Sequence, residues 1–408
     1  MDAHNAIEQA ARDSYGRLVA YLTVRWRDLA AAEDALADAF LAALEAWPRT
    51  GVPNKPEAWL LTAARRRLID GARRARVQAN AAPALLAMAE EARQLASSAE
   101  IEFPDERLKM LFICAHPEID PAVRTPLMLQ SVLGIDAARI ASAFVVKPST
   151  MGQRLTRAKA KIRGERIRFE VPGADQLPQR LDAVLEAIYA AYGSGWDDVT
   201  GVDPRRKGLA EEAICIGRLL ARFMPAEPEV QGLLALMLHC EARRDARRNE
   251  AGSYVPLSGQ DIALWSKAMI GEAERCLHNA AQAGRVGRFQ LEAAIQSVHA
   301  QRAWTGRIEW EQIALLYEGL VRLAPTVGAL VGRAAAVAEV RGADEGLALL
   351  REIPAEAVKS YQPYWALAAH LFKRAERAGE ARDAYGRAIG LCTDPSVREY
   401  LARQARLI

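Results

Sequence analysis

The stretch Gly134–Arg168, GIDAARIASAFVVKPSTMGQRLTRAKAKIRGERIR, decides the fold class that the sequence predicts. Asp136 can cap a short helix, because its side chain accepts hydrogen bonds from the first free N–H groups. The apolar side of this helix would consist of Ile140, Ala141 and Phe144. After a tight connection at 145–148, a second helix opens at Lys147 or Ser149. Its apolar positions recur on one face: Met151, Leu155, Ala158 and Ile162. The stretch therefore predicts two short helices packed across a tight turn.

The other faces of the second helix are polar and basic, and the packed pair is typical of a helix-turn-helix. Arginine can pair bidentately with guanine and glutamine with adenine, so this helix could read a major groove. The candidate base-reading residues are Ser149, Thr150, Gln153, Arg154 and Arg157. Lys161, further along, suits a phosphate, which supplies salt-sensitive affinity without sequence information. The alternative is a solvated basic helix on an ordinary bundle.

A further helix pattern lies upstream, where Ala31–Trp47 reads AAEDALADAFLAALEAW. Its apolar positions form one broad stripe: Ala35, Leu36, Ala39, Phe40, Ala43, Leu44 and Trp47. Glu33, Asp34 and Asp38 crowd the first turns, where the helix dipole by itself would favour them. The functional alternative is an acidic surface that docks a basic partner.

After a loop with Pro and Gly at 48–56, Glu57–Arg76 predicts an arginine-rich helix, EAWLLTAARRRLIDGARRAR. Its predicted buried side consists of Leu60, Leu61, Ala64, Leu68 and Ile69. Arginines beside Trp59 could bind single-stranded or melted DNA, with cations on the backbone and a ring for stacking. Trp59 suits the core equally well.

The whole chain predicts an all-α fold, because Ala, Leu, Arg and Glu dominate and alternating β-branched residues are scarce. Its 408 residues, 51% of them hydrophobic, suffice for two to three domains. The predicted parts are a helical block at 5–77, a linker at 78–103, a second helical block at 104–168, and a long helical region at 176–408. Within the last, His370–Leu391 resembles a tetratricopeptide unit with a turn at Gly379, the alternative being an irregular helical bundle.

Several classes of protein are not supported. No apolar run approaches the ~20 residues that span a membrane, and the polar start Met1–Ala10 does not suit a signal peptide, so we expect a cytoplasmic protein. The five cysteines form no C-x-x-C pair and favour buried or free thiols. No catalytic constellation, phosphate-binding loop or four-ligand zinc pattern occurs in the sequence. We therefore expect neither an enzyme nor a cofactor or metal.

In their order, these segments resemble extracytoplasmic-function sigma factors. AEDALADAFLAALEAW is similar to region 2 of that family, PEAWLLTAARRRLIDGARR to its −10-reading helix, and IASAFVVKPSTMGQRLTRAKAKIR to its region 4 helix-turn-helix. FPDERLKMLFICAHPEID and PEVQGLLALMLHCEARRDAR resemble a subgroup with a C-terminal tetratricopeptide-like domain. The resemblance covers most of the chain.

The resemblance implies two partners, the RNA polymerase core and promoter DNA. Docking on the β′ clamp helices, with further contact to β, would involve Glu33, Asp34, Asp38 and Phe40. The melted −10 element would meet Asn54, Lys55, Trp59, Arg65 and Arg66. The −35 element would be read by Ser149, Thr150, Gln153, Arg154 and Arg157, with Lys161 beside them.

The charge of the chain is divided: the first two fifths are basic and the remainder is slightly acidic. A basic part is expected of a module that touches nucleic acid. The acidic region 176–408 could fold back on the basic blocks or bind a protein partner, and so modulate activity. The alternative function is a stand-alone helix-turn-helix regulator that senses a ligand or peptide. The arginine-rich −10-like helix favours the sigma factor, because an ordinary repressor has no use for it.

Overall fold

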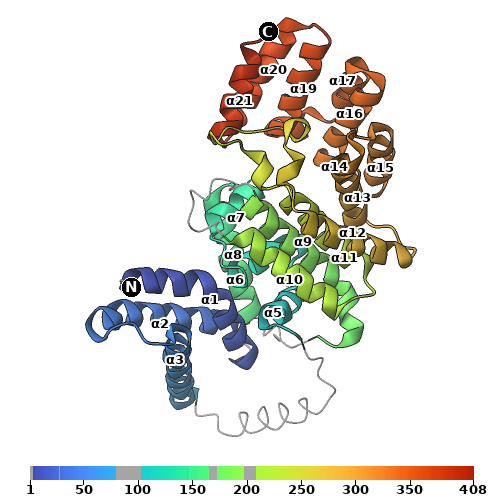
Figure 1. The fold of residues 1–408 in the computed structure, drawn as a ribbon. Helices are drawn as coiled ribbons and strands as arrows, with labels where there is room; N and C mark the ends of the chain where they lie inside the picture. The colour runs from blue at the N-terminus through green and yellow to red at the C-terminus, as the bar shows by residue number, and fades with distance from the viewer. Residues whose placement is uncertain (1–2, 27, 80–102, 145, 165–171, 197–207) are drawn as a thin grey trace. The chain divides into compact units, whose positions relative to one another are not determined.

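The computed structural model describes residues 3–26, 28–79, 103–144, 146–164, 172–196 and 208–408. Their regular structure is helical throughout (Figure 1), and β pairing among them is limited to an isolated bridge between Arg248 and Tyr254. The all-α prediction is confirmed for these residues. The chain forms two compact units, Met1–Phe223 and Met224–Ile408, which are described one at a time below.

The first unit is built from nine α-helices and one 3₁₀ helix in its described residues. They are α1 (Ala3–Trp26), α2 (Leu29–Thr50), α3 (Pro56–Ala79), α5 (Glu106–Cys114), α6 (Pro121–Ser131), α7 (Ala137–Ala143), α8 (Pro148–Gly164), η1 (Ala174–Gln176), α9 (Leu177–Trp196) and α10 (Leu209–Phe223). Most of the predicted linker at 78–103 lies outside the described residues.

The first three helices pack on one another around Trp47, whose side chain is fully buried. Leu22 of α1, Leu36 of α2 and Leu60 of α3 are also fully buried, so each helix contributes to the same core. Polar groups hold α3 to α1, because Glu57 accepts hydrogen bonds from Ser14 Oγ at 2.5 Å and from Arg17 at 2.7 Å. The apolar spacing in the sequence is therefore realised as a three-helix bundle.

The apolar stripes of α2 and α3 are narrower than the sequence predicted. Leu44 and Ile69 were expected to be buried, but 41% and 44% of their surface is exposed. Helix α2 also extends beyond its predicted end at Trp47. Pro48 lies inside its last turn, and the Gly51 N–H bonds the Trp47 carbonyl at 3.0 Å. A proline near a helix end removes one N–H without preventing the final bond.

Helices α9 and α10, which the sequence assigned to the long C-terminal region, belong to the first unit. The guanidinium of buried Arg180 on α9 donates to the carbonyl of Phe112 on α5 at 3.0 Å, and burial lowers its pKa. Phe103, Phe112 and Phe223 stack nearby, with ring centroids 4.7 to 6.4 Å apart. These contacts join the region around α5 to α9 and α10.

The second unit is a succession of helices in which neighbours along the chain pack together. They are α11 (Pro228–Glu241), η2 (Asp245–Arg247), η3 (Leu257–Gly259), η4 (Ile262–Leu264), α12 (Lys267–Gln282), α13 (Arg288–Ala300), α14 (Arg302–Thr305), α15 (Trp310–Leu323), α16 (Val327–Arg341), α17 (Ala343–Arg351), α18 (Ala355–Val358), α19 (Gln362–Arg374), α20 (Ala378–Leu391) and α21 (Pro395–Ala405). Helix α11 packs on α12 and α13, α15 on α16, and α19 on α20 (Figure 1).

The turn between α19 and α20 differs from its prediction. The sequence placed it at Gly379, but Gly379 lies inside α20, and the chain turns at Ala375–Arg377. Glu376 supplies the left-handed backbone there, with φ of 58°, a conformation that glycine usually adopts. The small residues of α20 do face the core, since Ala381, Ala384 and Ala388 are buried.

A loop that follows α11 is tied to the start of α21. Arg248 Nη2 lies 2.7 Å from Asp394 Oδ2, and the Ser396 hydroxyl donates to the Gly252 carbonyl at 3.3 Å. The rings of Tyr254 and Tyr400 meet edge to face with centroids 5.4 Å apart. These contacts join segments about 146 residues apart in the sequence, and we refer to them as the Arg248–Asp394 tie.

Helix α13 begins at Arg288 without a capping side chain from its own N-cap residue, and Glu229 of α11 caps it instead. Its carboxylate accepts from the backbone N–H groups of Phe289 at 2.9 Å and Gln290 at 3.2 Å. Replacing Glu229 with alanine removes charge-assisted bonds from the N–H groups of two buried residues, so we expect a loss of about 1–3 kcal/mol in the free energy of unfolding.

Urea unfolding of the full chain, followed by circular dichroism, measures this loss. Glu250→Ala is the matched control, because Glu250 is an exposed carboxylate in a turn. Equal midpoints for the Glu229 and Glu250 variants would show that the cap contributes nothing.

Among the described residues, no helix is both long and apolar enough to cross a membrane.

Candidate nucleic-acid interface

The helices α7 and α8 form the pair that the sequence predicted around Gly134–Arg168. Asp136 caps α7 as expected, accepting from the N–H groups of Ala138 and Arg139, both at 3.1 Å. Ile140 and Ala141 are buried on α7. Phe144 was expected in the same apolar side, but 37% of its surface is exposed. The apolar seam of this helix is therefore shorter than predicted.

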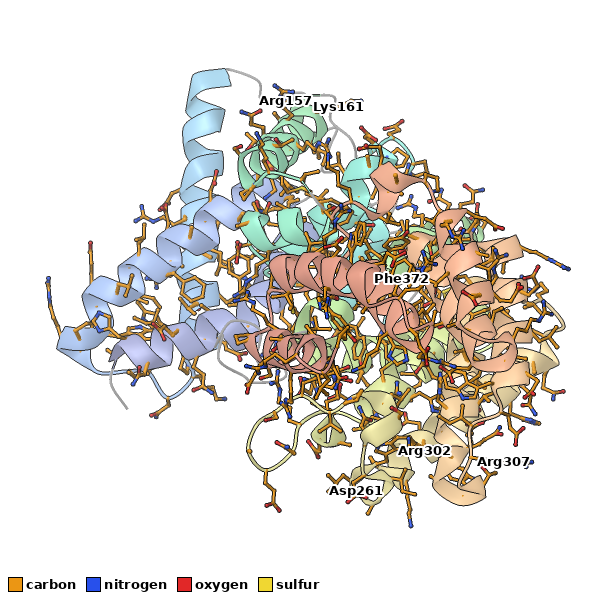
Figure 2. The ribbon with its side chains drawn as sticks, turned by 90° about the horizontal axis from the view of Figure 1, so that it is seen from above. Arg157, Lys161, Asp261, Arg302, Arg307 and Phe372 are labelled. Atoms are coloured by element: carbon orange, nitrogen blue, oxygen red, sulfur yellow. The ribbon has the colours of Figure 1, made fainter. Side chains whose placement is uncertain are left out.

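On α8 the apolar spacing is confirmed, and it determines which face remains outside. Met151, Leu155 and Ile162 are buried, and Ala158 is half-buried. The other faces carry the candidate DNA-binding residues. Thr150 is half-buried, and the base-reading candidates Ser149, Gln153, Arg154 and Arg157 and the phosphate-binding candidate Lys161 are exposed. Arg157 and Lys161 project at the outer side of α8 (Figure 2). The five exposed residues span three turns, so one helix presents a continuous polar and basic surface.

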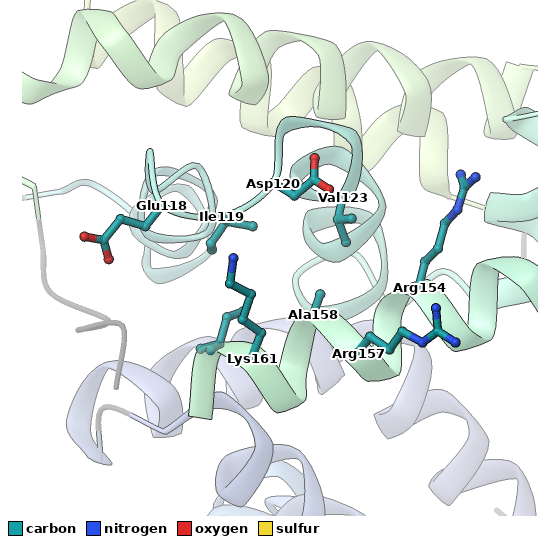
Figure 3. A pocket seen from close by; sticks show the side chains of 9 residues that line it. Glu118, Ile119, Asp120, Val123, Arg154, Arg157, Ala158 and Lys161 are labelled. Carbon is teal, nitrogen blue, oxygen red and sulfur yellow. The ribbon is translucent and has the colours of Figure 1, made fainter. Parts of the chain in front are cut away.

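A hollow of about 230 Å³ lies between α8 and the loop that joins α5 to α6 (Figure 3). Arg154, Arg157 and Lys161 line one wall, and the carboxylates of Glu118 and Asp120 stand on the other. Asp120 is also engaged as the cap of α6, accepting from the Ala122 N–H at 3.0 Å. The basic surface of α8 is thus bordered by acidic side chains on one side.

The four candidate polymerase-docking residues on α2 fall into two groups. Asp34 and Asp38 are exposed, with Arg67 Nε 3.8 Å from Asp38 Oδ2. Phe40 is half-buried and stacks on Tyr15 of α1, with ring centroids 6.4 Å apart. Glu33 is mostly enclosed, and its carboxylate binds residues of α6 and α8. Of these four residues, Asp34 and Asp38 therefore present their carboxylates at the surface of α2.

The electrostatic effect of this acidic cluster reaches α1. Burial raises the pKa of Tyr15 to about 12, and the negative charges of Glu33 and Asp34 act in the same direction. Burial also raises the pKa of the Cys114 thiol on α5, with Glu33 adding to the increase. Glu33 thus lies where α1, α2 and α5 converge.

The candidate −10 residues are also divided between surface and interior. Asn54, Lys55 and Arg66 are exposed. Trp59 is half-buried and meets the buried ring of Trp47 edge to face, with centroids 5.6 Å apart. Arg65 is half-buried over the Tyr21 ring, 5.1 Å from its centroid, and donates to the Tyr21 hydroxyl. Trp59 and Arg65 therefore contribute to packing of the first three helices.

Sequence reasoning missed Ser131 and Lys159, the two residues that bind Glu33. They lie 98 and 126 residues from Glu33, and no spacing rule relates positions so far apart. In the described part of the chain, no group of three or more His, Cys, Asp or Glu side chains is arranged to hold a metal ion.

Comparison with known proteins defines the class of this arrangement. The sigma-70 region 2 family matches residues 11–77, which are the helices α1 to α3, and a family of unknown function, DUF6596, matches residues 180–281. The chain therefore has a sigma-70 region 2 domain at its N-terminal end and a DUF6596 domain further on. Region 2 implies a sigma-factor role in transcription initiation, with binding to the RNA polymerase core and a non-enzymatic function for this part of the chain.

The chain also matches a relative over nearly its whole length. It is 36% identical to an uncharacterized protein of Rhizobium meliloti (strain 1021) over 402 residues, which cover 98% of this chain and 94% of the relative. The chain belongs to the same family as that protein. No solved structure matches it.

Proposed function

We propose that this protein is an alternative sigma factor of the extracytoplasmic-function type, in which α7 and α8 are the region 4 helix-turn-helix. The observation that carries the proposal is the exposed surface of α8, where Gln153, Arg154 and Arg157 lie outside its buried apolar seam. In a chain with a sigma-70 region 2 domain, a second DNA-binding helix is what reading of a −35 element requires.

The −10 element would be bound at the start of α3 and the loop before it. Asn54, Lys55 and Arg66 offer an amide and two cations at the surface, where they can reach bases and phosphates of melted DNA. Trp59 and Arg65 would act by holding α3 in place, since both side chains pack inside the helical bundle.

Polymerase docking would use the exposed face of α2. Asp34 and Asp38 lie on it, and Leu41 follows one turn later with most of its surface exposed. Acidic groups beside an apolar side chain would suit a basic, partly apolar surface on the β′ clamp helices. The helical region after α8 contains the DUF6596 domain and, nearer the C-terminal end of the chain, the tetratricopeptide-like segment. This region would modulate the sigma-factor activity.

Run-off transcription with purified core polymerase tests the proposal. The full chain should support initiation from promoters with −10 and −35 elements, whereas core polymerase without it should not. If the chain bound duplex promoter DNA but neither core polymerase nor melted −10 DNA, a stand-alone regulator would replace the sigma factor.

The surface carboxylates of α2 give a quantitative expectation. Replacing Asp34 and Asp38 together with alanine should weaken binding of core polymerase about 10-fold, since each exposed charge pair contributes up to ~1 kcal/mol. Fluorescence anisotropy of labelled chain, titrated with core polymerase, measures the loss. Glu8→Ala with Glu106→Ala is the control, because it removes two carboxylates outside α2. An unchanged affinity would place polymerase docking elsewhere.

A further inference from the structure

The carboxylate of Glu33 joins the region 2 domain to the helix pair α7–α8 within the first unit. Lys159 of α8 places Nζ 2.9 Å from Oε1 and 2.7 Å from Oε2. Ser131, at the end of α6, donates to Oε1 at 2.8 Å and is fully buried. Only 15% of the Glu33 side chain and 20% of the Lys159 side chain are exposed. This arrangement is a partly buried ion pair with a supporting hydrogen bond, rather than a surface contact.

A second contact, which involves no charged groups, joins the region 2 domain to the helices that follow it. Gly16 lies inside α1, and a Cβ atom there would stand 1.9 Å from the carbonyl oxygen of Val132, just after α6. Glycine in a helix interior costs about 0.5–1 kcal/mol relative to alanine. Here the close approach of two backbones requires it. The Gly16 approach and the Glu33 ion pair lie on different helices, so they support the contact independently.

The contact is too compact for simultaneous reading of both promoter elements. Ser149 lies about 15 Å from Lys159 along α8, and α2 extends about 26 Å beyond Glu33 toward the loop that holds Asn54, at ~1.5 Å per helical residue. Through the ion pair, Asn54 and Ser149 are therefore within roughly 70 Å of each other. Elements centred about 25 base pairs apart are separated by about 85 Å, at ~3.4 Å per base pair.

We infer that the Glu33–Lys159 ion pair and the Gly16–Val132 approach form an autoinhibitory contact, which must open before the two promoter elements can be bound together. This inference rests on the proposed sigma-factor function. Opening also frees Glu33 for a cation of the polymerase and Lys159 for a DNA phosphate. Both partners bind the open form better than the closed form, so each shifts the population toward it.

Distances between spin labels in the free full-length chain test the contact without polymerase or DNA. The labels are placed at Thr62→Cys on α3 and Thr156→Cys on α8, which are exposed positions, with the exposed Cys215→Ser. Lys159→Glu and Glu33→Lys should each raise the ratio of open to closed molecules at least 10-fold. The double variant Glu33→Lys with Lys159→Glu should restore the short distance, because the pair is then reversed and intact.

Two further variants sharpen the experiment. Arg157→Glu makes the same charge change on α8 but outside the contact, and it should leave the distances unchanged. Gly16→Ala alters no charge and should open the contact by steric overlap alone, while the helix content by circular dichroism stays the same. Because Gly16→Ala leaves Glu33 and Lys159 in place, it should also speed association with core polymerase about 10-fold.

Unchanged distances in Lys159→Glu and Gly16→Ala would overturn the inferred contact. Opened distances without faster association of Gly16→Ala with core polymerase would overturn its inhibitory role. Failure of the sigma-factor function is distinguishable, since it would appear as absent run-off transcription in every variant while the distances still responded to Lys159→Glu.

Discussion

Replacing Arg154 and Arg157 together with alanine is expected to weaken binding to a −35 duplex by about 100-fold or more, because an arginine paired bidentately with guanine contributes about 1–3 kcal/mol. Both side chains are exposed on α8 outside its buried seam, so their loss should leave the fold unchanged. Fluorescence anisotropy with the assembled holoenzyme and a labelled duplex measures the affinity.

A salt series separates base reading from attraction to phosphates. If the arginines read bases, the loss should be larger for the preferred sequence than for a scrambled one. If they bind phosphates, both sequences should lose affinity equally, and the salt slope should fall by about 1 per residue. Arg49→Ala with Arg222→Ala removes two exposed arginines outside α8 as a control. A double variant that binds like this control would exclude α8 as the reading helix.

The second unit is expected to lose about 3 kcal/mol of stability between pH 6.5 and pH 5, because two of its histidines are held neutral. Burial, with the positive charge of Arg243 adding to it, lowers the pKa of His239 on α11 to about 3. His299 on α13 has a pKa lowered to about 4 by burial, Arg243 and Arg302. Glu274 lies 3.4 Å from His239 Nε2, but it is already bonded to Ser297 at 2.6 Å, so burial prevails.

The sign follows from which state binds the proton. Below pH 6.5 the unfolded chain protonates both imidazoles, whereas the folded chain keeps them neutral until about pH 4 for His299 and about pH 3 for His239. Acid therefore favours the unfolded state throughout this window, and the effect is absent above pH 7.

Urea unfolding at several pH values measures this dependence. His239→Leu should reduce its slope by about half, because one of the two buried imidazoles is removed. His278→Leu is the control, since His278 is exposed on α12. A stability that is constant from pH 7 to pH 5, or a slope that both variants share with the original chain, would contradict the prediction.

The sequence predicted those parts of the fold that depend on local spacing. Asp136 caps α7, and Met151, Leu155 and Ile162 are buried on α8, because a cap and an apolar face need only neighbours in the chain. The predictions are wrong where the burial of a side chain depends on residues far away in the sequence. Phe144 and Leu44 have apolar side chains at suitable positions, yet nothing packs over them completely. The turn at Glu376 was missed because a glutamate gives no signal for left-handed backbone.

The candidate site shows the same division. Exposure of Arg154, Arg157 and Asp38 follows from helical periodicity and could be read from the chain. The enclosure of Glu33 could not, because it depends on Ser131 and Lys159, which meet it only through the packing of α2, α6 and α8. The close contact of Gly16 with Val132 could not be predicted either, because a glycine within a helical pattern indicates only a lower helix propensity.

The Arg248–Asp394 tie bears on how the second unit comes apart. A linear succession of helices, each touching mainly its neighbours, frays from whichever end is weaker. Here the loop after α11 and the start of α21 restrain each other. Neither end of the second unit can therefore unfold while these contacts are intact. Such a unit behaves as one cooperative block and offers proteases few partly opened intermediates.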